Sequence, residues 1–475
     1  MPPATDLLAR EIGARLDQLR WSRRHTTILV ALGAGWLFDS FEVQLFSSAV
    51  GPLGDHFGAS VFARDAILAV WLGGILLGAL AGGRLTDRFG RRRLFLVTLL
   101  WYAGFTVLTG FSPDLRAVYV FRFLAALGVG AEYAIVNAAI AEFMPARIRG
   151  RANVVVMNFW PAGAILAALL AYVILDTFAV HAATSWRYMF GLGGVLALVV
   201  LAFRRRIPES PRWLVARGRA DEALRIVADL EAATAVSGAD RARGYAGVAA
   251  ATPLPVRRAL RQLVRHYPGR LALGATLDLA EAFGYYGLFA LLSVVVLHRV
   301  HISDSDIPFF YIVGNVGGLA GGLAVSTVFD RIGRYRTVTI AYAAAAGGVA
   351  LLAAATATGS AGWVTVAFIA ANAAGTAAWT SAYPTFTELF PTHLRGAGVG
   401  FSVAVGRIGA IVGTLLLPSL ATRVGPTASY VIVVAFWLAG VAAMAVHARH
   451  EQADPARRPL EQVAPPRLAP VPAAV

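Results

Sequence analysis

The chain has 475 residues, of which 57% are hydrophobic and 15% are charged, and its mean hydropathy is +0.64. This composition excludes an ordinary soluble protein, because apolar runs of about 20 residues recur along almost the whole chain. The absence of cysteine excludes disulfides and thiolate metal sites. The net charge of +15 comes from arginines placed between the apolar runs, so it does not indicate nucleic-acid binding.

Twelve apolar segments are candidates for membrane-spanning helices. In chain order they cover residues 27–49, 66–83, 94–112, 117–142, 152–175, 188–203, 270–297, 308–329, 337–358, 362–389, 397–421 and 427–447. We therefore predict an all-α membrane protein with two six-helix bundles, 27–203 and 269–450. An amphipathic N-terminus (1–26) suited to the membrane surface precedes them, a linker with short helices (204–268) joins them, and a Pro-rich tail (451–475) is expected to be disordered.

Arginines cluster in alternate connections, at 84–93, 147–151, 204–206 and 330–336. An excess of positive charge marks the cytoplasmic side of a membrane protein. Both termini and the linker are therefore predicted to be cytoplasmic, which agrees with an even number of spans. No apolar segment followed by a cleavage site opens the chain, so we expect a multi-pass protein of a bacterial inner membrane that keeps its first span.

Two of the predicted spans carry the same pattern of acidic residues. The pattern is glycine, aspartate, glutamate and an aromatic residue at spacings of 4, 3 and 4, which places all four on one helix face. It occurs as Gly35, Asp39, Glu42 and Phe46, and again as Gly274, Asp278, Glu281 and Tyr285. AEFMPARIRGR (141–151) and TELFPTHLRGA (387–397) repeat at a similar offset. A duplicated bundle of this kind places a central site at the interface of its halves.

Charged side chains within the spans are candidates for substrate binding and proton coupling, because carboxylates cost about 2.5–3.5 kcal/mol at mid-bilayer and usually mark a pathway or relay. A carboxylate binds and releases a proton as burial and a nearby arginine change in turn. The candidates are Asp39, Glu42, Glu132, Asp278 and Glu281, with Arg122 and Arg407 as counter-charges. Arg407 either binds a substrate carboxylate or neutralises an acid, and the acids either couple protons or brace the bundle.

Polar and aromatic residues near these charges are candidates for lining a cavity, with helix packing as the alternative reading for each. They are Phe46, Asn158, Trp160, Tyr285, Tyr286, Trp379 and Tyr383.

Three motifs resemble those of the major facilitator superfamily, over about residues 15–450. The motif G-x-L-x-D-R-x-G-R-R is met by Gly83, Leu85, Asp87, Arg88, Gly90, Arg91 and Arg92, and its second copy keeps Asp330, Arg331, Gly333 and Arg334 but has Ser326 in place of the first glycine. Arg122, Gly128 and Gly130 match R-x(5)-G-x-G, and PESPRWL follows the sixth span. The acidic pair in the first span resembles that of aromatic-acid and nicotinate carriers and synaptic-vesicle-glycoprotein-2-like proteins.

The resemblance implies a transporter that works by alternating access, with the two G-x-L-x-D-R copies acting as latches between the halves. It favours proton-coupled uptake of an aromatic or other organic acid by a monomer, with the lipid bilayer, a small solute and protons as partners. Five carboxylates against two arginines suit an organic cation better, so a cation carrier is the nearest alternative, followed by a sugar carrier or a receptor. We find no H-E-x-x-H, P-loop or G-x-S-x-G, and expect neither an enzyme nor a cofactor or metal.

Overall fold

The computed structural model describes residues 4–145, 147–173, 184–234, 256–302, 307–391, 394–451 and 454–456, which form helices and connections without any strand. The N-terminal half contains α2 (Arg23–His56), α3 (Val61–Phe89), α4 (Arg91–Gly110), α5 (Leu115–Phe143), α6 (Arg149–Met157), α7 (Phe159–Tyr172) and α8 (Ser185–Arg204). The C-terminal half contains α12 (Pro268–Leu291), a π-helix (Leu292–Val296), α13 (Leu297–Arg299), α14 (Ile307–Ile332), α15 (Arg334–Ala357), α16 (Ala361–Leu389), α17 (Arg395–Val424) and α18 (Pro426–His450).

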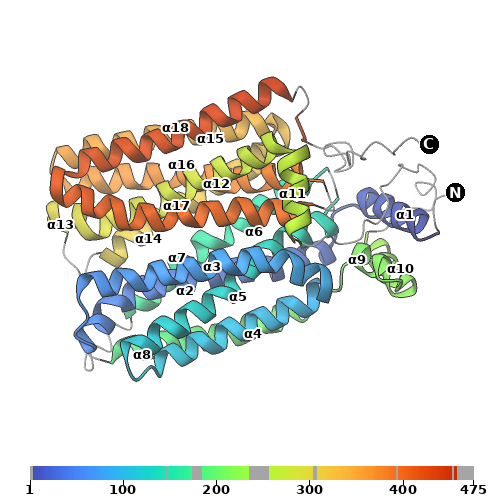
Figure 1. Cartoon of the computed structure of the whole chain (residues 1–475), viewed down its shortest axis with the longest axis horizontal. Helices are drawn as coiled ribbons and strands as arrows, with labels where there is room; N and C mark the ends of the chain where they lie inside the picture. The colour runs from blue at the N-terminus through green and yellow to red at the C-terminus, as the bar shows by residue number, and fades with distance from the viewer. Residues whose placement is uncertain are drawn as a thin grey trace.

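The long helices form two bundles that lie side by side, one from each half of the chain (Figure 1). Within the described residues, ten helices are long and apolar enough to cross a membrane, which confirms the predicted all-α membrane fold. The other two expected spans, α5 and α12, are helices at the expected places but are not among these ten. The count of twelve spans therefore stays a prediction for α5 and α12.

Two of the predicted spans are not uniform α-helices. The fifth span is divided at Asn158 into α6 and α7, and Pro161 follows in the first turn of α7, where it has no N–H to donate to Met157. The seventh span continues from α12 through the π-helix. Irregular turns of this kind are frequent at functional sites of membrane helices.

Four short helices, α1 (Ala4–Gln18), α9 (Pro211–Ala216), α10 (Ala220–Ala232) and α11 (Val256–His266), lie at one end of the bundles (Figure 1). The apolar residues Ile12 and Leu16 of α1 are buried where α1 packs on α9 and α10, so this face is covered by protein and not by lipid as the sequence suggested. Arg15 donates two hydrogen bonds of 2.8 Å to Glu231 of α10.

The arginine-rich connections gather at this same end. Arg147 donates to the Leu19 carbonyl at 3.2 Å, and Arg217 donates to the Arg88 carbonyl at 3.0 Å. The turns before α4 and α15 use equivalent glycines, Gly90 (φ +85°) and Gly333 (φ +95°), because side-chain-bearing residues rarely adopt a positive φ. Residues 174–183, 235–255 and 457–475 lie outside the described residues, and with them most of the predicted disordered tail.

Candidate functional site

A small cavity lies at the interface between the two halves. Its lining comes from α2, α5 and α7 on one side and from α12, α16 and α17 on the other: Trp36, Tyr133, Trp160, Glu281, Tyr285, Tyr286, Trp379 and Arg407. The cavity measures about 20 Å³, room for one or two water molecules, so the halves are closed around it. This is the interface at which the sequence repeat predicts a site.

Arg407 of α17 is the cation of this cavity and is only 2% exposed. It donates to the hydroxyls of Tyr286 at 3.0 Å and Tyr383 at 3.3 Å, whereas its Nε has no hydrogen-bond partner among the described residues. Its charge interacts with the carboxylates of Asp278 and Glu281. An arginine that two hydroxyls hold in place, with one N–H still unpaired, can orient a carboxylate ligand.

The absence of a side chain at Gly406 brings Asp278 against α17. A Cβ atom at Gly406 would overlap the Asp278 carboxylate, so glycine is required for this close approach. Asp278 is fully buried behind the lining residues and is not itself part of the cavity wall. Tyr383 likewise lies behind the wall and contributes through its bond to Arg407.

Asp39 of α2 is buried at 4% exposure. Its charge interacts with those of Glu42, Arg204 and Arg407, and Tyr133 of the cavity wall forms a hydrogen bond with it. Arg204 forms an ion pair with Glu132 of α5 and donates to the Phe95 carbonyl at 3.0 Å. The prediction that Arg204 belongs to a cytoplasmic connection is therefore wrong, because its side chain turns back into the bundle and is 1% exposed. Glu132 is held by this pair and does not line the cavity.

Gly35 makes room for the Arg204–Glu132 pair. A Cβ atom at Gly35 would overlap the guanidinium of Arg204 and the carboxylate of Glu132. The first glycine of the repeated acidic pattern thus lets two charged side chains pack directly against the backbone of α2. In the second half, Gly274 makes room for the Ser402 hydroxyl in a similar way.

Glu42 belongs to a second charged cluster inside the N-terminal bundle. It accepts a hydrogen bond from Thr106, and its Oε2 lies 3.8 Å from a terminal nitrogen of Arg122. The Arg122 guanidinium lies 3.7 Å from the ring centre of Trp71 and 4.8 Å from that of Phe46. Phe46 therefore covers Arg122, and the prediction that it lines the cavity is wrong.

The remaining predicted lining residues divide between the cavity and its surroundings. Trp160, Tyr285, Tyr286 and Trp379 line the cavity. Asn158 does not; it lies at the break between α6 and α7, donates to the Val154 carbonyl at 2.8 Å, and has an Oδ1 without a partner in the described structure.

Sequence reasoning missed two wall residues, Trp36 and Tyr133. Each stands next to a residue that it did single out, Gly35 and Glu132 respectively. Trp36 also precedes Asp39 by three residues, so that the two share a helix face. That spacing is the signal that would have found it.

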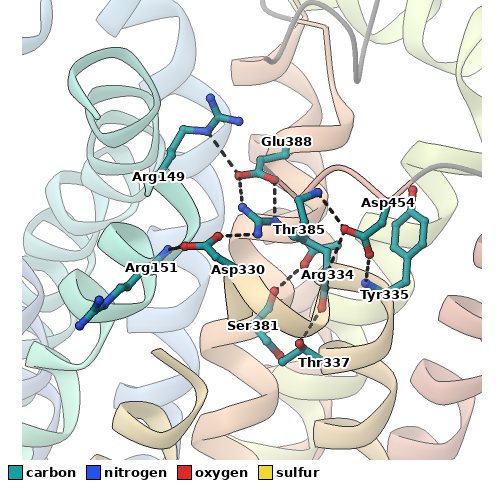
Figure 2. Close-up of polar contacts among 12 residues, drawn as sticks. Arg149, Arg151, Asp330, Arg334, Tyr335, Thr337, Ser381, Thr385, Glu388 and Asp454 are labelled. Carbon is teal, nitrogen blue, oxygen red and sulfur yellow. Dashed lines mark hydrogen bonds and ion pairs between the residues drawn. The ribbon is translucent and has the colours of Figure 1, made fainter. Parts of the chain in front are cut away.

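A network of charged groups ties the halves together at the end that carries the short helices (Figure 2). Glu388 of α16 accepts from Arg334 of α15 at 3.0 and 3.1 Å and from Arg149 of the other half at 3.3 Å. Asp330 pairs with Arg334 at 2.6 Å and accepts from the Arg151 backbone N–H at 3.0 Å. Glu388 and Asp330 therefore each contact both halves.

In the first copy of the motif, the described contacts of Arg91 lie within the N-terminal half and the linker. Arg91 binds Glu142 at 2.7 Å, and its backbone N–H donates to Glu209 at 2.8 Å. In the second copy Asp454 takes the place of Glu209 by accepting from the backbone N–H groups of Arg334 and Tyr335. The surroundings of Gly83 and of the Asp87 side chain lie outside what the structure describes, and Arg88 and Arg331 are exposed.

Glu388→Gln is expected to open this end of the molecule, because it removes the charge that holds arginines from both halves. Losing a charged hydrogen-bond partner costs about 1.5–3 kcal/mol, which corresponds to a tenfold to hundredfold shift toward separated halves. Since the chain has no cysteine, spin labels at Arg92→Cys and Arg336→Cys, both exposed, measure the separation directly. Glu142→Gln, which breaks a pair within one half, is the control; an equal widening there would contradict the latch.

The family model "Sugar (and other) transporter" matches residues 31–449. The chain is 27% identical to the niacin transporter NiaP of Acinetobacter baylyi over 434 residues, 86% of this chain and 90% of that protein. It is 26% identical to organic cation/carnitine transporter 7 of Arabidopsis thaliana, over 83% of this chain and 85% of that one. The solved proton:xylose symporter XylE superposes with a TM-score of 0.76 at 20% identity, over 93% of this chain and 98% of that chain, which shows a shared fold. The chain thus belongs to the sugar (and other) transporter family of the major facilitator superfamily, and it is a multi-pass membrane transporter rather than an enzyme.

Proposed function

We propose that this transporter takes up a small organic acid, an aromatic one first among them, together with protons and by alternating access. The observation that carries the proposal is Arg407, a buried arginine that faces a cavity between the two halves and is oriented by two tyrosine hydroxyls. A carboxylate is the ligand that such an arginine binds best. Movement of one half against the other exposes the cavity to each side of the membrane in turn.

Proton coupling follows from the buried acid that connects the cavity to the N-terminal bundle. Asp39 interacts with Tyr133 and Arg407 on the cavity side and with Arg204 on the other side, and its Oδ1 has no hydrogen-bond partner among the described residues. A carboxylate placed between a ligand-binding arginine and a fixed ion pair changes its proton affinity when a ligand takes up the charge of the arginine. Binding of an acid and binding of a proton are then linked.

One relative, a niacin transporter, agrees with this proposal in the solute that it carries. A solved structure of similar fold, a proton:xylose symporter, carries a sugar and supports the proposal only in its coupling to protons. Two of the five carboxylates have cations of their own, because Glu132 is paired with Arg204 and Glu42 lies beside Arg122. Asp39, Asp278 and Glu281 then share Arg407, so the proposal requires that some of these three carboxylates are protonated when an acid binds.

An organic cation is the second candidate, and Glu281 favours it. This carboxylate lines the cavity beside aromatic rings, an arrangement that attracts cations. A relative is an organic cation/carnitine transporter. A sugar or a receptor role without transport are further alternatives, and for the cellular setting we propose a monomer in a bacterial inner membrane with cytoplasmic termini.

Uptake into proteoliposomes tests the proposal, with a panel of labelled benzoate, pyridine-3-carboxylate, sugars and organic cations. With an inward proton gradient of one pH unit, an acid is expected to accumulate up to about tenfold for each coupled proton. Asp39→Asn is expected to abolish accumulation yet keep exchange of the same acid, which also shows that the variant is folded. Accumulation that is unchanged in Asp39→Asn, or uptake of cations in place of acids, would refute the proposal.

A further inference from the structure

The linker ends in a short helix, α11, that lies across the ends of the C-terminal helices. In Figure 1 its axis runs crosswise to the long helices of that half. One face of α11 packs on α12 and α17, where Ala259 and Leu263 are 3% and 0% exposed. Because the long helices span the membrane, a helix that crosses their ends lies parallel to the membrane surface.

The opposite face of α11 is basic. It carries four exposed arginines that fall within an arc of about 100° on an ideal helix: Arg257, Arg258, Arg261 and Arg265. None of the four has an ion-pair partner among the described residues, whereas Arg270, in the first turn of α12, binds Glu451 at 2.7 Å. We call these four residues the α11 arginines. A row of unpaired guanidinium groups attracts anions.

An exposed apolar side chain borders the α11 arginines. Val264 is 60% exposed and lies about 20° from Arg257 around an ideal helix. Leu260, one turn before Val264, is half-buried. Arginines beside apolar side chains are typical of helices that lie at the boundary between lipid headgroups and acyl chains. A free anion would gain nothing from Val264, so this face favours a lipid over a soluble anion.

Another amphipathic helix of the linker, α10, lies farther from the bundles and has a different charge. Its apolar residues Val227 and Leu230 are buried, and its exposed face carries Asp221, Arg225 and Asp229 at spacings of four residues. In Figure 1 α10 lies beyond the ends of the long helices, whereas α11 lies against them. The basic helix is therefore the one at the level of the membrane surface.

We propose that the α11 arginines bind the phosphate groups of anionic phospholipids in the leaflet at this end of the bundles. A guanidinium group pairs with a phosphate through two parallel hydrogen bonds, and each arginine near an anionic membrane surface strengthens binding about fivefold.

The connection of α11 to the transport site gives this contact a consequence. Only Tyr267 separates α11 from α12, which carries Glu281 of the cavity wall. Lipid bound to α11 therefore anchors the C-terminal half to the membrane surface while the two halves move against each other. This inference does not depend on which solute is transported.

Contact between α11 and lipid tests the inference. Since the chain has no cysteine, Val264→Cys carries a single fluorophore beside the α11 arginines. The purified full-length protein is placed in phosphatidylcholine nanodiscs, and a doxyl-labelled phosphatidylglycerol or phosphatidylcholine is added as the quencher. Phosphatidylglycerol is expected to reach half-maximal quenching at a mole fraction at least about 25-fold lower, and this preference is expected to weaken as salt screens the charges.

Arg261→Gln/Arg265→Gln, introduced into the labelled protein, removes two of the α11 arginines. It is expected to lower the preference for phosphatidylglycerol about 25-fold, at about fivefold for each arginine. Quenching by phosphatidylcholine is expected to stay unchanged, which shows that α11 keeps its place in the variant.

Arg219→Gln/Arg225→Gln is the matched control, because it removes the same charge from exposed positions at α10, at the same end of the molecule. It is expected to keep the full preference for phosphatidylglycerol. Equal quenching by the two lipids, or an equal loss of preference in the control, would overturn the inference. Displacement of the lipid by glycerol phosphate, which carries the charge without acyl chains, would overturn it as well.

Discussion

Arg407→Gln is expected to lower the affinity for the transported acid by at least about thirtyfold, because truncating one partner of a buried, hydrogen-bonded charge pair costs 2 kcal/mol or more. Arg407→Lys is expected to recover only part of this loss, since an ammonium group keeps the charge but not the planar set of donors. Equilibrium binding of the acid to the purified variants measures both effects.

The loss has two physical explanations, because Arg407 also interacts with the buried carboxylate of Asp278. The double variant Arg407→Gln/Asp278→Asn separates the two explanations. It also removes the negative charge of Asp278, which the loss of Arg407 would otherwise leave uncompensated. If Arg407 binds the substrate carboxylate, the double variant stays as weak as Arg407→Gln. Recovery of wild-type affinity in the double variant would show that Arg407 only neutralises Asp278, and would remove the main support for an acid as the substrate.

The sequence predicted Arg407 as a site residue, because a single arginine in an apolar run is energetically costly and therefore stands out. The same reasoning identified Asp278 and Glu281, and the repeat assigned them to positions in the second half that are equivalent to those of Asp39 and Glu42 in the first. The sequence located residues at the interface of the halves where the signal was a charged side chain in an apolar run, or a pattern that occurs twice.

The sequence did not show which side chains are neighbours in space. Asp39 and Glu42 share a helix face in projection, but Asp39 meets Arg204 and Tyr133 whereas Glu42 lies beside Arg122. Three residues correspond to a rotation of about 300°, and packing of the adjacent helices decides which partner each side chain meets. Phe46 was misplaced for the same reason, because its ring packs on a guanidinium within the N-terminal bundle.

Aromatic residues gave the weakest signal of all. Trp36 lines the cavity, and Trp71 packs on Arg122 inside the bundle, yet each is a tryptophan in an apolar run. Lining a cavity and packing on an arginine both use the aromatic face of the indole ring. The two roles differ only in which helix lies opposite that ring. Hydropathy treats them alike, so only the three-dimensional arrangement assigns them.

Arg204→Met is expected to lower the free energy of unfolding by about 3–5 kcal/mol, because it leaves Glu132 as a buried carboxylate without its ion-pair partner. The double variant Arg204→Met/Glu132→Leu is expected to regain most of this stability, since a buried ion pair replaced by apolar residues of similar size is often neutral or stabilising. Denaturant unfolding of the purified protein in detergent measures both.

Arg205→Met supplies the matched control, because Arg205 is the next residue in the chain and is exposed. Its replacement is expected to change the free energy of unfolding by less than about 0.5 kcal/mol. The charge pattern of the sequence treats Arg204 and Arg205 as equal members of one cytoplasmic cluster, and on that reading both variants alter membrane orientation and neither alters stability. The structure separates them, since one side chain compensates a carboxylate inside the bundle and the other faces solvent. Equal stability of the two variants would therefore show that Arg204 only determines membrane orientation. Glu132 and Asp39 would then lack the fixed cation on which the proposed proton coupling depends.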